Sequence, residues 1–271
     1  MSAVPADPSA ALPSPAAEGQ ARLFGWARAL GFAALTVAAI GAVWHLVVVG
    51  FEIPHFIMPT PAAAWAAFKE NQAAIGDALA YTLRSAAIGL AVATAVALAL
   101  AALFVASDTA TRAVLPLVIG LRTAPVLAIA PILILVFGRG LGTAIVVVVI
   151  VAFFPIMVNA MKGFRAARRN ALELMHVCGA SPLQTFVKVR FPYALPFIFT
   201  GLRAASASGI LSAMLAEWLS GAPGLGTMIL EAASYRDLAL LWAAVVVSMV
   251  MAFAIFMLTA GAERRVLSWT R

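Results

Sequence analysis

Three long apolar runs without a charged side chain constrain this sequence more than any other feature. They are Ser85–Ser107, Gly140–Met161 and Leu238–Ala260. Each is long enough for the roughly 20 residues that a helix needs to cross a hydrocarbon core of about 30 Å. Since a lipid environment demands that backbone groups bond within the segment, we expect each run to form one membrane-spanning helix.

Three further runs have a similar length. We interpret the first as an uncleaved span, because it is too long for the apolar part of a signal peptide and no convincing cleavage site follows it. The other two are interrupted by charge or proline. The three runs are Leu30–Val49, Ala113–Gly138 with Arg122, Pro125 and Pro131, and Ala194–Trp218 with Arg203 and Glu217. The sequence therefore predicts an all-α, polytopic membrane protein with six transmembrane helices.

Composition agrees with this interpretation. Hydrophobic residues make up 64% of the chain and charged residues 11%, against about 45–50% and about 25% in soluble domains. A soluble globule is excluded. The single cysteine, Cys178, excludes an internal disulfide, and three scattered histidines give no spacing typical of a metal site.

The net charge of +7 comes from 18 Lys and Arg against 11 Asp and Glu, and the positions of these cations indicate the orientation in the membrane. Most of them lie in segments that share one side of the membrane, above all between Lys162 and Arg190. Because Lys and Arg favour the cytoplasmic side, we expect both termini of this multi-pass chain to be cytoplasmic. Nucleic acid is not an expected partner.

We expect four regions along the chain. The first is rich in Pro and Ala and lacks a large apolar run, so it cannot offset its ordering entropy. The regions are a disordered cytoplasmic tail over 1–28, a first transmembrane helix over 29–50, an outer loop over 51–82 and a helical membrane core over 83–267. Within the outer loop, Thr60 and Pro61 predict the start of a short helix that carries Trp65 and Phe68 at the membrane interface.

The cytoplasmic segment 162–193 predicts a helical hairpin. Gly179 suits the left-handed position that ends a first helix, and Ser181 with Pro182 suits the start of a second. The expected helices are Asn170–Cys178 and Pro182–Phe191, with Pro192 as the stop. Two alternatives remain for the hairpin: packing against the membrane surface, or docking to a soluble partner.

Residues of this hairpin resemble the EAA loop of permease subunits of binding-protein-dependent ABC importers. The similarity rests on Glu173-Leu174-Met175, Gly179, Leu195-Pro196 and the phrase GASPLQTFVKVRFPYALPFIFTGLR. It extends from Pro59 to Leu267 and is strongest to the branch serving nitrate, sulfonates, taurine and thiamine-precursor pyrimidines. The departures are Leu174 and Met175 in place of Ala-Ala, together with His176 and Cys178.

The resemblance implies that 83–267 is a MetI-like ABC permease core in a bacterial inner membrane, without enzymatic activity. It implies that a separate ATPase binds ATP and magnesium, which agrees with the absence of a GxxxxGK[ST] loop, and that this chain needs no cofactor. A periplasmic or lipid-anchored substrate-binding protein and a second permease copy, forming a homodimer, are the other implied partners. The residues implied to contact the ATPase are Glu173, Leu174, Met175, His176, Gly179, Ala180, Ser181 and Pro182.

A second group of candidates lies within the apolar runs, where ionisable residues are costly and usually face the bundle interior or water. The candidates for a pathway or gate are Arg122, Pro125, Pro131, Arg203, Glu217 and Trp218. The alternatives are snorkelling for the two arginines, a hydrated carboxylate at the rim for Glu217, and ordinary membrane-helix prolines. The glycines of 138–142 and 221–226 are interpreted as turn residues.

Two questions of function stay open at this point. The resemblance favours a thiamine-type pyrimidine precursor as substrate, with aliphatic sulfonates, taurine or nitrate as the alternative. An ion-coupled secondary transporter is a remote alternative, because it predicts repeats and paired intramembrane acids, and Glu217 is the one acid within the predicted spans.

Overall fold

The computed structural model describes residues 35–123 and 125–267, without the side chains of 121–123 and 127. Every regular element in these ranges is a helix, which confirms the all-α prediction. The chain forms two compact units that divide between Ala63 and Ala64. The predicted tail over 1–28 and the start of the predicted first span lie outside the described residues.

The first unit contains the helix Leu35–Gly50. Trp44 lies in this helix, and its indole Nε1 donates to the carbonyl of Pro59 in the segment that follows, over 3.1 Å. Thr60 then caps the next helix, because its Oγ1 accepts the N–H of Ala63 over 3.3 Å. Helix α2 (Pro61–Glu70) begins there and crosses into the second unit, so the short helix predicted from Thr60 and Pro61 is confirmed.

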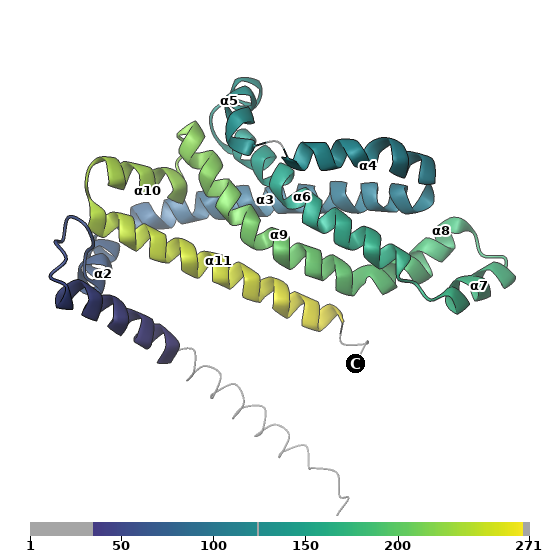
Figure 1. The fold of residues 1–271 in the computed structure, drawn as a ribbon, viewed down its shortest axis with the longest axis horizontal. Coiled ribbons are helices and arrows are strands. Elements are labelled where there is room, and N and C mark those ends of the chain that lie inside the picture. The colour runs from purple at the N-terminus through teal and green to yellow at the C-terminus, as the bar shows by residue number, and fades with distance from the viewer. Residues whose placement is uncertain (1–34, 124, 268–271) are drawn as a thin grey trace, which may run out of the picture. The chain divides into compact units, whose positions relative to one another are not determined.

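The second unit contains the remaining helices (Figure 1). They are α3 (Gln72–Ala106), α4 (Asp108–Thr123), α5 (Val126–Phe137), α6 (Leu141–Arg165), α7 (Arg169–Val177), α8 (Pro182–Thr185), the π-helix η1 (Phe186–Arg190), α9 (Phe191–Ser220), α10 (Leu225–Ser234) and α11 (Leu238–Val266). The outer loop was expected over 51–82, but α3 already begins at Gln72, so the last part of that range is helical.

Four helical segments in the described part of the chain are long and apolar enough to cross a membrane: α3, α6, Pro182–Ser220 and α11. The first predicted span is described only from Leu35. The run Ala113–Gly138, expected as one helix, is instead two helices, α4 and α5. Pro125 stands at the N-terminal boundary of α5 with an extended backbone, and a proline disfavours helical geometry in the residue before it.

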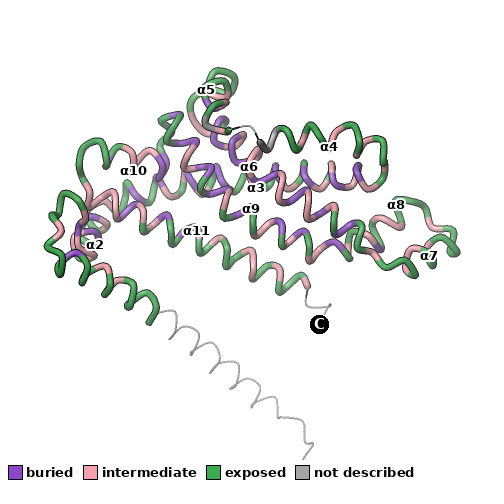
Figure 2. The backbone as a smooth tube through the Cα atoms, viewed as in Figure 1, coloured by how far each residue is buried: buried purple, intermediate pink, exposed green. Residues whose placement is uncertain are grey.

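Small residues let the central helices of the second unit approach closely. Along α3, Ala93, Ala97 and Ala101 recur every four residues and are fully buried. Such a stripe lies on one face of a helix. Figure 2 shows buried positions along α3, α6 and α9, whereas much of α11 is exposed. Close helix approach through small residues is the usual packing of membrane helices.

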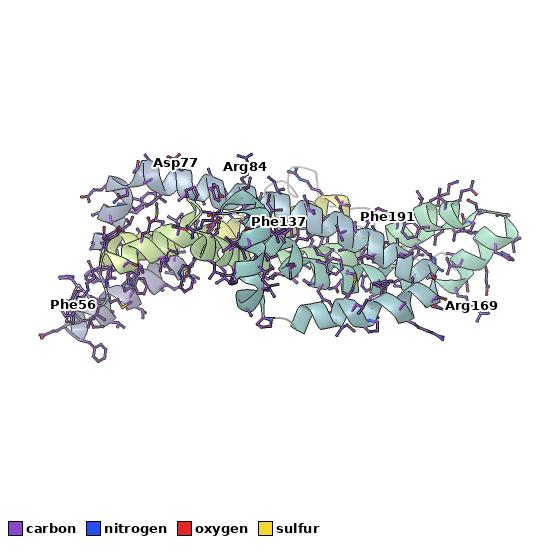
Figure 3. All side chains as sticks on the ribbon, turned by 90° about the horizontal axis from the view of Figure 1, so that it is seen from above. Phe56, Asp77, Arg84, Phe137, Arg169 and Phe191 are labelled. Carbon is purple, nitrogen blue, oxygen red and sulfur yellow. The ribbon has the colours of Figure 1, made fainter. Side chains whose placement is uncertain are left out.

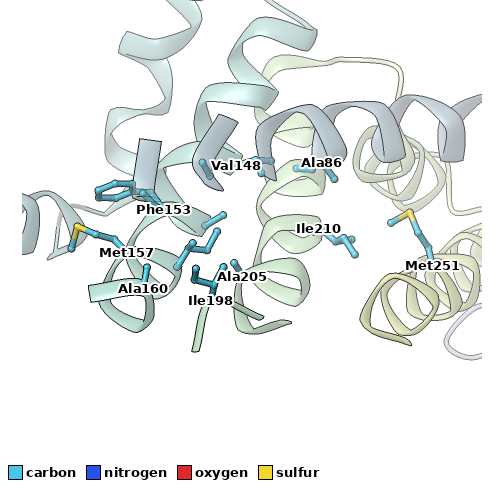
Figure 4. Close-up of a cluster of buried hydrophobic side chains, with 14 of the residues drawn as sticks. Ala86, Val148, Phe153, Met157, Ala160, Ile198, Ala205, Ile210 and Met251 are labelled. Carbon is cyan, nitrogen blue, oxygen red and sulfur yellow. The ribbon is translucent and has the colours of Figure 1, made fainter. Parts of the chain in front are cut away.

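Helix α6 lies between α3 and α9 and touches both at glycines. A Cβ added at Gly89 of α3 would lie 2.6 Å from Cβ of Val148, and one at Gly201 of α9 would lie 2.9 Å from the carbonyl oxygen of Pro155. Figure 4 shows Val148 near Ala86, and Met157 and Ala160 near Ile198, in this core. Side chains larger than glycine would separate the three helices at these points.

The two ends of α9 carry different structures. Figure 1 shows α7 and α8 beyond the N-terminal end of α9, and α10 beside its C-terminal end. Figure 3 labels Arg169, the first residue of α7, and Phe191, where α9 begins. The predicted coupling residues therefore lie beyond one end of α9, and Glu217 and Trp218 lie near its other end.

Candidate functional site

The hairpin of α7 and α8 has the caps that its sequence predicts. Gly179 has a φ of +69°, the left-handed region that favours glycine, and the following N–H of Ala180 donates to the carbonyl of Met175 over 2.9 Å. Ser181 Oγ accepts the N–H of Gln184 over 3.2 Å, while Gln184 Oε1 accepts the N–H of Ser181 over 2.9 Å. This is a complete capping box in front of Pro182, and the contribution of Gln184 was not anticipated.

The second arm of the hairpin does not end at Pro192, as the sequence had predicted. Pro182–Ser220 forms one continuous helical segment of 39 residues. Its π-turn includes a hydrogen bond from the N–H of Phe191 to the carbonyl of Phe186. A proline lacks an N–H and its ring clashes with the carbonyl four residues earlier. The wider π-turn directly before Pro192 accommodates both effects.

Three phenylalanine rings fix the base of the hairpin to the end of α6. The ring centroid of Phe164 lies 4.9 Å from that of Phe186 and 6.4 Å from that of Phe191. In addition, Nη1 of Arg190 donates to the carbonyl of Phe164 over 3.0 Å. The signal in the sequence is the spacing of five between Phe186 and Phe191, which brings side chains to one face only in a π-turn.

Both helices of the hairpin expose apolar side chains. Leu174 is 63% exposed, Val177 83% and Leu183 72%. Glu173 lies on the same exposed helix and pairs with Arg169 one turn earlier, with 2.7 Å between Nε and Oε1. An exposed ion pair of this kind contributes little stability. Clustered exposed apolar residues are typical of a surface that binds another protein.

A groove of about 880 Å³ separates the hairpin from the C-terminal end of α3. Three of the predicted coupling residues, His176, Ala180 and Pro182, line it together. Leu103 and Ala106 of α3 form the opposite wall. The predicted coupling residues are thus divided between this groove and the exposed face that carries Glu173 and Leu174.

At the other end of α9, Glu217 is completely buried. Its Oε2 accepts the hydroxyl of Thr82 over 2.9 Å and the backbone N–H of Gly226 over 3.1 Å. Its Oε1 accepts the hydroxyl of Ser85 over 3.3 Å. The alternative of a hydrated carboxylate at the rim is therefore wrong, because protein donors replace water around both oxygens. Thr82 and Ser85 come from α3, which is 135 and 132 residues away in sequence, whereas Gly226 of α10 is nine residues away.

The glycines after α9 are more than turn residues. Gly221 adopts a left-handed φ of +67° and ends α9. A Cβ at Gly224 would overlap the carboxyl group of Glu217, and one at Gly226 would overlap the carbonyl of Met214. The interpretation of 221–226 as ordinary turns is thus incomplete, since two of these glycines let the backbone pass directly over α9.

The other pathway candidates are separate from this cluster. Arg203 of α9 pairs with Glu263 of α11, with 3.3 Å between Nη2 and Oε2, a partner that the sequence did not indicate. Trp218 is 51% exposed. Pro131 lies inside α5, and the side chain of Arg122 lies outside the described residues. Among described residues, no three His, Cys, Asp or Glu side chains gather in a way that would hold a metal.

Comparison with known proteins identifies relatives over most of the chain. Residues 93–268 match the family described as binding-protein-dependent transport system inner membrane component. A probable ABC transporter permease protein of Haemophilus influenzae is 30% identical over 213 residues, which are 79% of this chain and 87% of that protein. The formylaminopyrimidine transport permease protein ThiX of Halalkalibacterium halodurans is 37% identical over 54% of this chain and 58% of that protein.

Other relatives are named for aliphatic sulfonates, nitrate and taurine. Among solved structures, the MetNI methionine ABC transporter in an inward-facing conformation has a TM-score of 0.58 at 19% identity, over 77% of this chain and 98% of that chain. This likeness confirms the predicted MetI-like fold.

The match to the family covers α6, α9, α11 and the hairpin, which are the elements that organise both groups of candidate residues. Relatives over this region are named as permease proteins. The chain therefore belongs to the family of binding-protein-dependent transport system inner membrane components, as a multi-pass permease subunit of an ABC importer and not as an enzyme.

Proposed function

We propose that the hairpin over 162–193 is the part of this permease that receives the ATPase. The observation that carries the proposal is the continuous helix Pro182–Ser220. It joins the hairpin directly to a membrane-spanning segment, so a force on the hairpin acts on the span without an intervening loop. The capping box and the left-handed Gly179 give the hairpin a defined shape for a partner to bind.

In this proposal, Glu173 and Leu174 contact the ATPase from the exposed face of α7, together with Val177. Their exposure in the isolated chain supports this, because a surface buried by a partner is open without it. His176, Ala180 and Pro182 shape the groove side. Met175 and Ser181 act within the hairpin, where Met175 accepts the N–H that follows Gly179.

We also propose that the hairpin and both termini face the cytoplasm. The positive charge around the hairpin supports this orientation, since Lys162, Arg165, Arg168 and Arg169 all precede or open α7. A second copy of this chain would supply the other half of the transport pathway, and a substrate-binding protein would dock on the opposite side of the membrane. Arg203, Pro125, Pro131 and Trp218 remain proposed pathway or gate residues.

For the substrate we propose a thiamine-type pyrimidine precursor. The similarity to a relative named for formylaminopyrimidine supports this choice. Relatives named for aliphatic sulfonates, taurine and nitrate support the alternative. Thermal unfolding of the cognate binding protein with formylaminopyrimidine, taurine, an alkanesulfonate and nitrate separates them: stabilisation by the pyrimidine alone is expected, and stabilisation by a sulfonate or nitrate overturns the substrate.

Co-purification with the ATPase tests the coupling role. We expect Leu174→Asp combined with Val177→Asp to reduce recovery of the ATPase at least tenfold, because both side chains would leave an apolar interface. Tyr235→Asp is the matched control, since Tyr235 is 83% exposed at the opposite end of the unit. Undiminished recovery with the double variant would show that the ATPase binds elsewhere.

A further inference from the structure

Helix α10 begins without a cap from its own segment. The residue before it is Gly224, which has no side chain, and no side-chain cap bond is present there. The first N–H groups of a helix have no partner within the helix and need one from elsewhere. Here the N–H of Leu225 donates to Thr82 Oγ1 over 3.0 Å, and that of Gly226 donates to Glu217 Oε2 over 3.1 Å.

The start of α10 is thus held by two other helices at once. Thr82 comes from α3 and Glu217 from α9, and the two side chains bond to each other. A side chain of α10 adds one more contact, because the hydroxyl of Thr227 donates to the backbone carbonyl of Glu217 over 2.9 Å. An anionic group at a helix N-terminus is favoured by the helix dipole. Glu217 therefore suits this position chemically as well as sterically.

Glu217 also lies three residues before the end of the continuous helix that starts in the hairpin. At a rise of 1.5 Å per residue, the 39 residues of Pro182–Ser220 span on the order of 60 Å. The segment carries the hairpin at one end and Glu217 near the other. Nothing else in this segment combines complete burial with bonds to both α3 and α10.

We propose that Glu217 is a positioning residue that fastens α10 to α9, so that movement of the hairpin reaches α10 on the opposite side of the membrane. The proposal rests on the proposed coupling role of the hairpin. In it, α10 moves with α9 when the ATPase acts, and α3 supplies the hydroxyls against which the contact is formed. The role is mechanical and requires the hydrogen bonds of Glu217 rather than contact with substrate.

This role predicts an unusual order among variants. In Glu217→Gln, the amide oxygen accepts from Thr82 and Gly226, and the NH₂ group donates to Ser85 Oγ. The Ser85 proton then has the carbonyl of Thr82 at 3.0 Å as its acceptor. The hydrogen bonds to Thr82, Ser85 and Gly226 all survive, so we expect stimulation of ATP hydrolysis by the binding protein to stay within twofold of wild type. Glu217→Leu keeps the approximate size but loses all three side-chain hydrogen bonds, to Thr82, Ser85 and Gly226. Thr82→Val loses the hydroxyl that links Glu217 to the N–H of Leu225.

The experiment uses the complete complex with its ATPase and binding protein, and measures phosphate release with and without the binding protein. We expect Glu217→Leu to retain ATPase recovery and basal hydrolysis, while stimulation by the binding protein falls at least tenfold. Thr82→Val should lower stimulation about threefold to fivefold. The hairpin variants, in contrast, lose the ATPase itself, so a failure of the coupling role is distinguishable from a failure of this one.

A direct readout of movement is maleimide labelling of Ser234→Cys, an exposed position at the end of α10, in a Cys178→Ser background. We expect ATP to change the labelling rate in this background and in Glu217→Gln, and not in Glu217→Leu. Loss of stimulation in Glu217→Gln would overturn the proposal, because it would assign the effect to the negative charge. An ATP response that survives in Glu217→Leu would overturn it as well.

Discussion

The guanidinium of Arg203 on α9 lies 3.3 Å from the carboxylate of Glu263 on α11. This ion pair connects two long apolar helices near their hairpin-side ends, since Arg203 lies in the first half of α9 and Glu263 in the last turn of α11. The two side chains are 34% and 19% exposed. Each ion therefore neutralises the other at a place where an unpaired charge is costly.

We predict that Glu263→Gln lowers the thermal stability of the purified permease, by an amount on the order of 1 kcal/mol because the pair is partly exposed. Arg203→Gln should have a similar effect. The double variant should be less destabilised than the sum of the two, since it leaves no unpaired charge. Additive losses would mean that the two residues act independently.

The glycines over Glu217 allow a second prediction. Gly224→Ala and Gly226→Ala should each destabilise the protein by about 3 kcal/mol or more, because the added methyl group overlaps buried atoms that have no room to move. Gly76→Ala in α3 is the matched control, since a Cβ there meets nothing within 4 Å. The control should stabilise its helix by up to ~1 kcal/mol. Folded yield and melting temperature in detergent measure all three.

The left-handed Gly179 gives a third prediction. Gly179→Ala meets no atoms within 4 Å, so its cost is purely conformational, about 1–2 kcal/mol. We expect it to weaken recovery of the ATPase several-fold while membrane insertion is unchanged. Gly179→Asn should restore most of the recovery, because asparagine tolerates this conformation. Equal recovery with all three residues would remove the turn from the coupling role.

The capping box gives a fourth prediction. Ser181→Ala should cost the hairpin about 1 kcal/mol, and Gln184→Ala a smaller amount. Ser181→Asp should be close to wild type, because aspartate caps as well as serine. Protease cleavage within the hairpin, measured on vesicles with this side exposed, should be faster for the alanine variants. A cleavage rate that does not respond to Ser181→Ala would indicate that a contact outside the hairpin maintains its shape.

Features set by residues close together in the sequence could be predicted, and features set by residues far apart in the sequence could not. Gly179, Ser181 and Pro182 act on neighbours within a few residues, and the structure confirms their local roles. Glu217 is bound by Thr82 and Ser85, 135 and 132 residues away. Ordinary polar residues in a long apolar run give no sign of such a partner.

The presence of a proline does not by itself determine whether a helix ends there. Pro125 was expected to lie inside one helix and instead stands at the start of a second, whereas Pro192 was expected to stop a helix and lies within one. The difference depends on the surroundings. The π-turn before Pro192 is held by aromatic packing of Phe164 against Phe186 and Phe191.

The glycine contacts between α3, α6 and α9 affect how this protein evolves. At Gly89, Gly163 and Gly201 the neighbouring helix of the same chain lies so near that even one methyl group has no space. We expect these three positions to accept no substitution in a saturation library, although none bears a functional group. Alanine is therefore predicted to be as damaging there as a charged residue, a pattern that separates backbone contact from ordinary apolar burial.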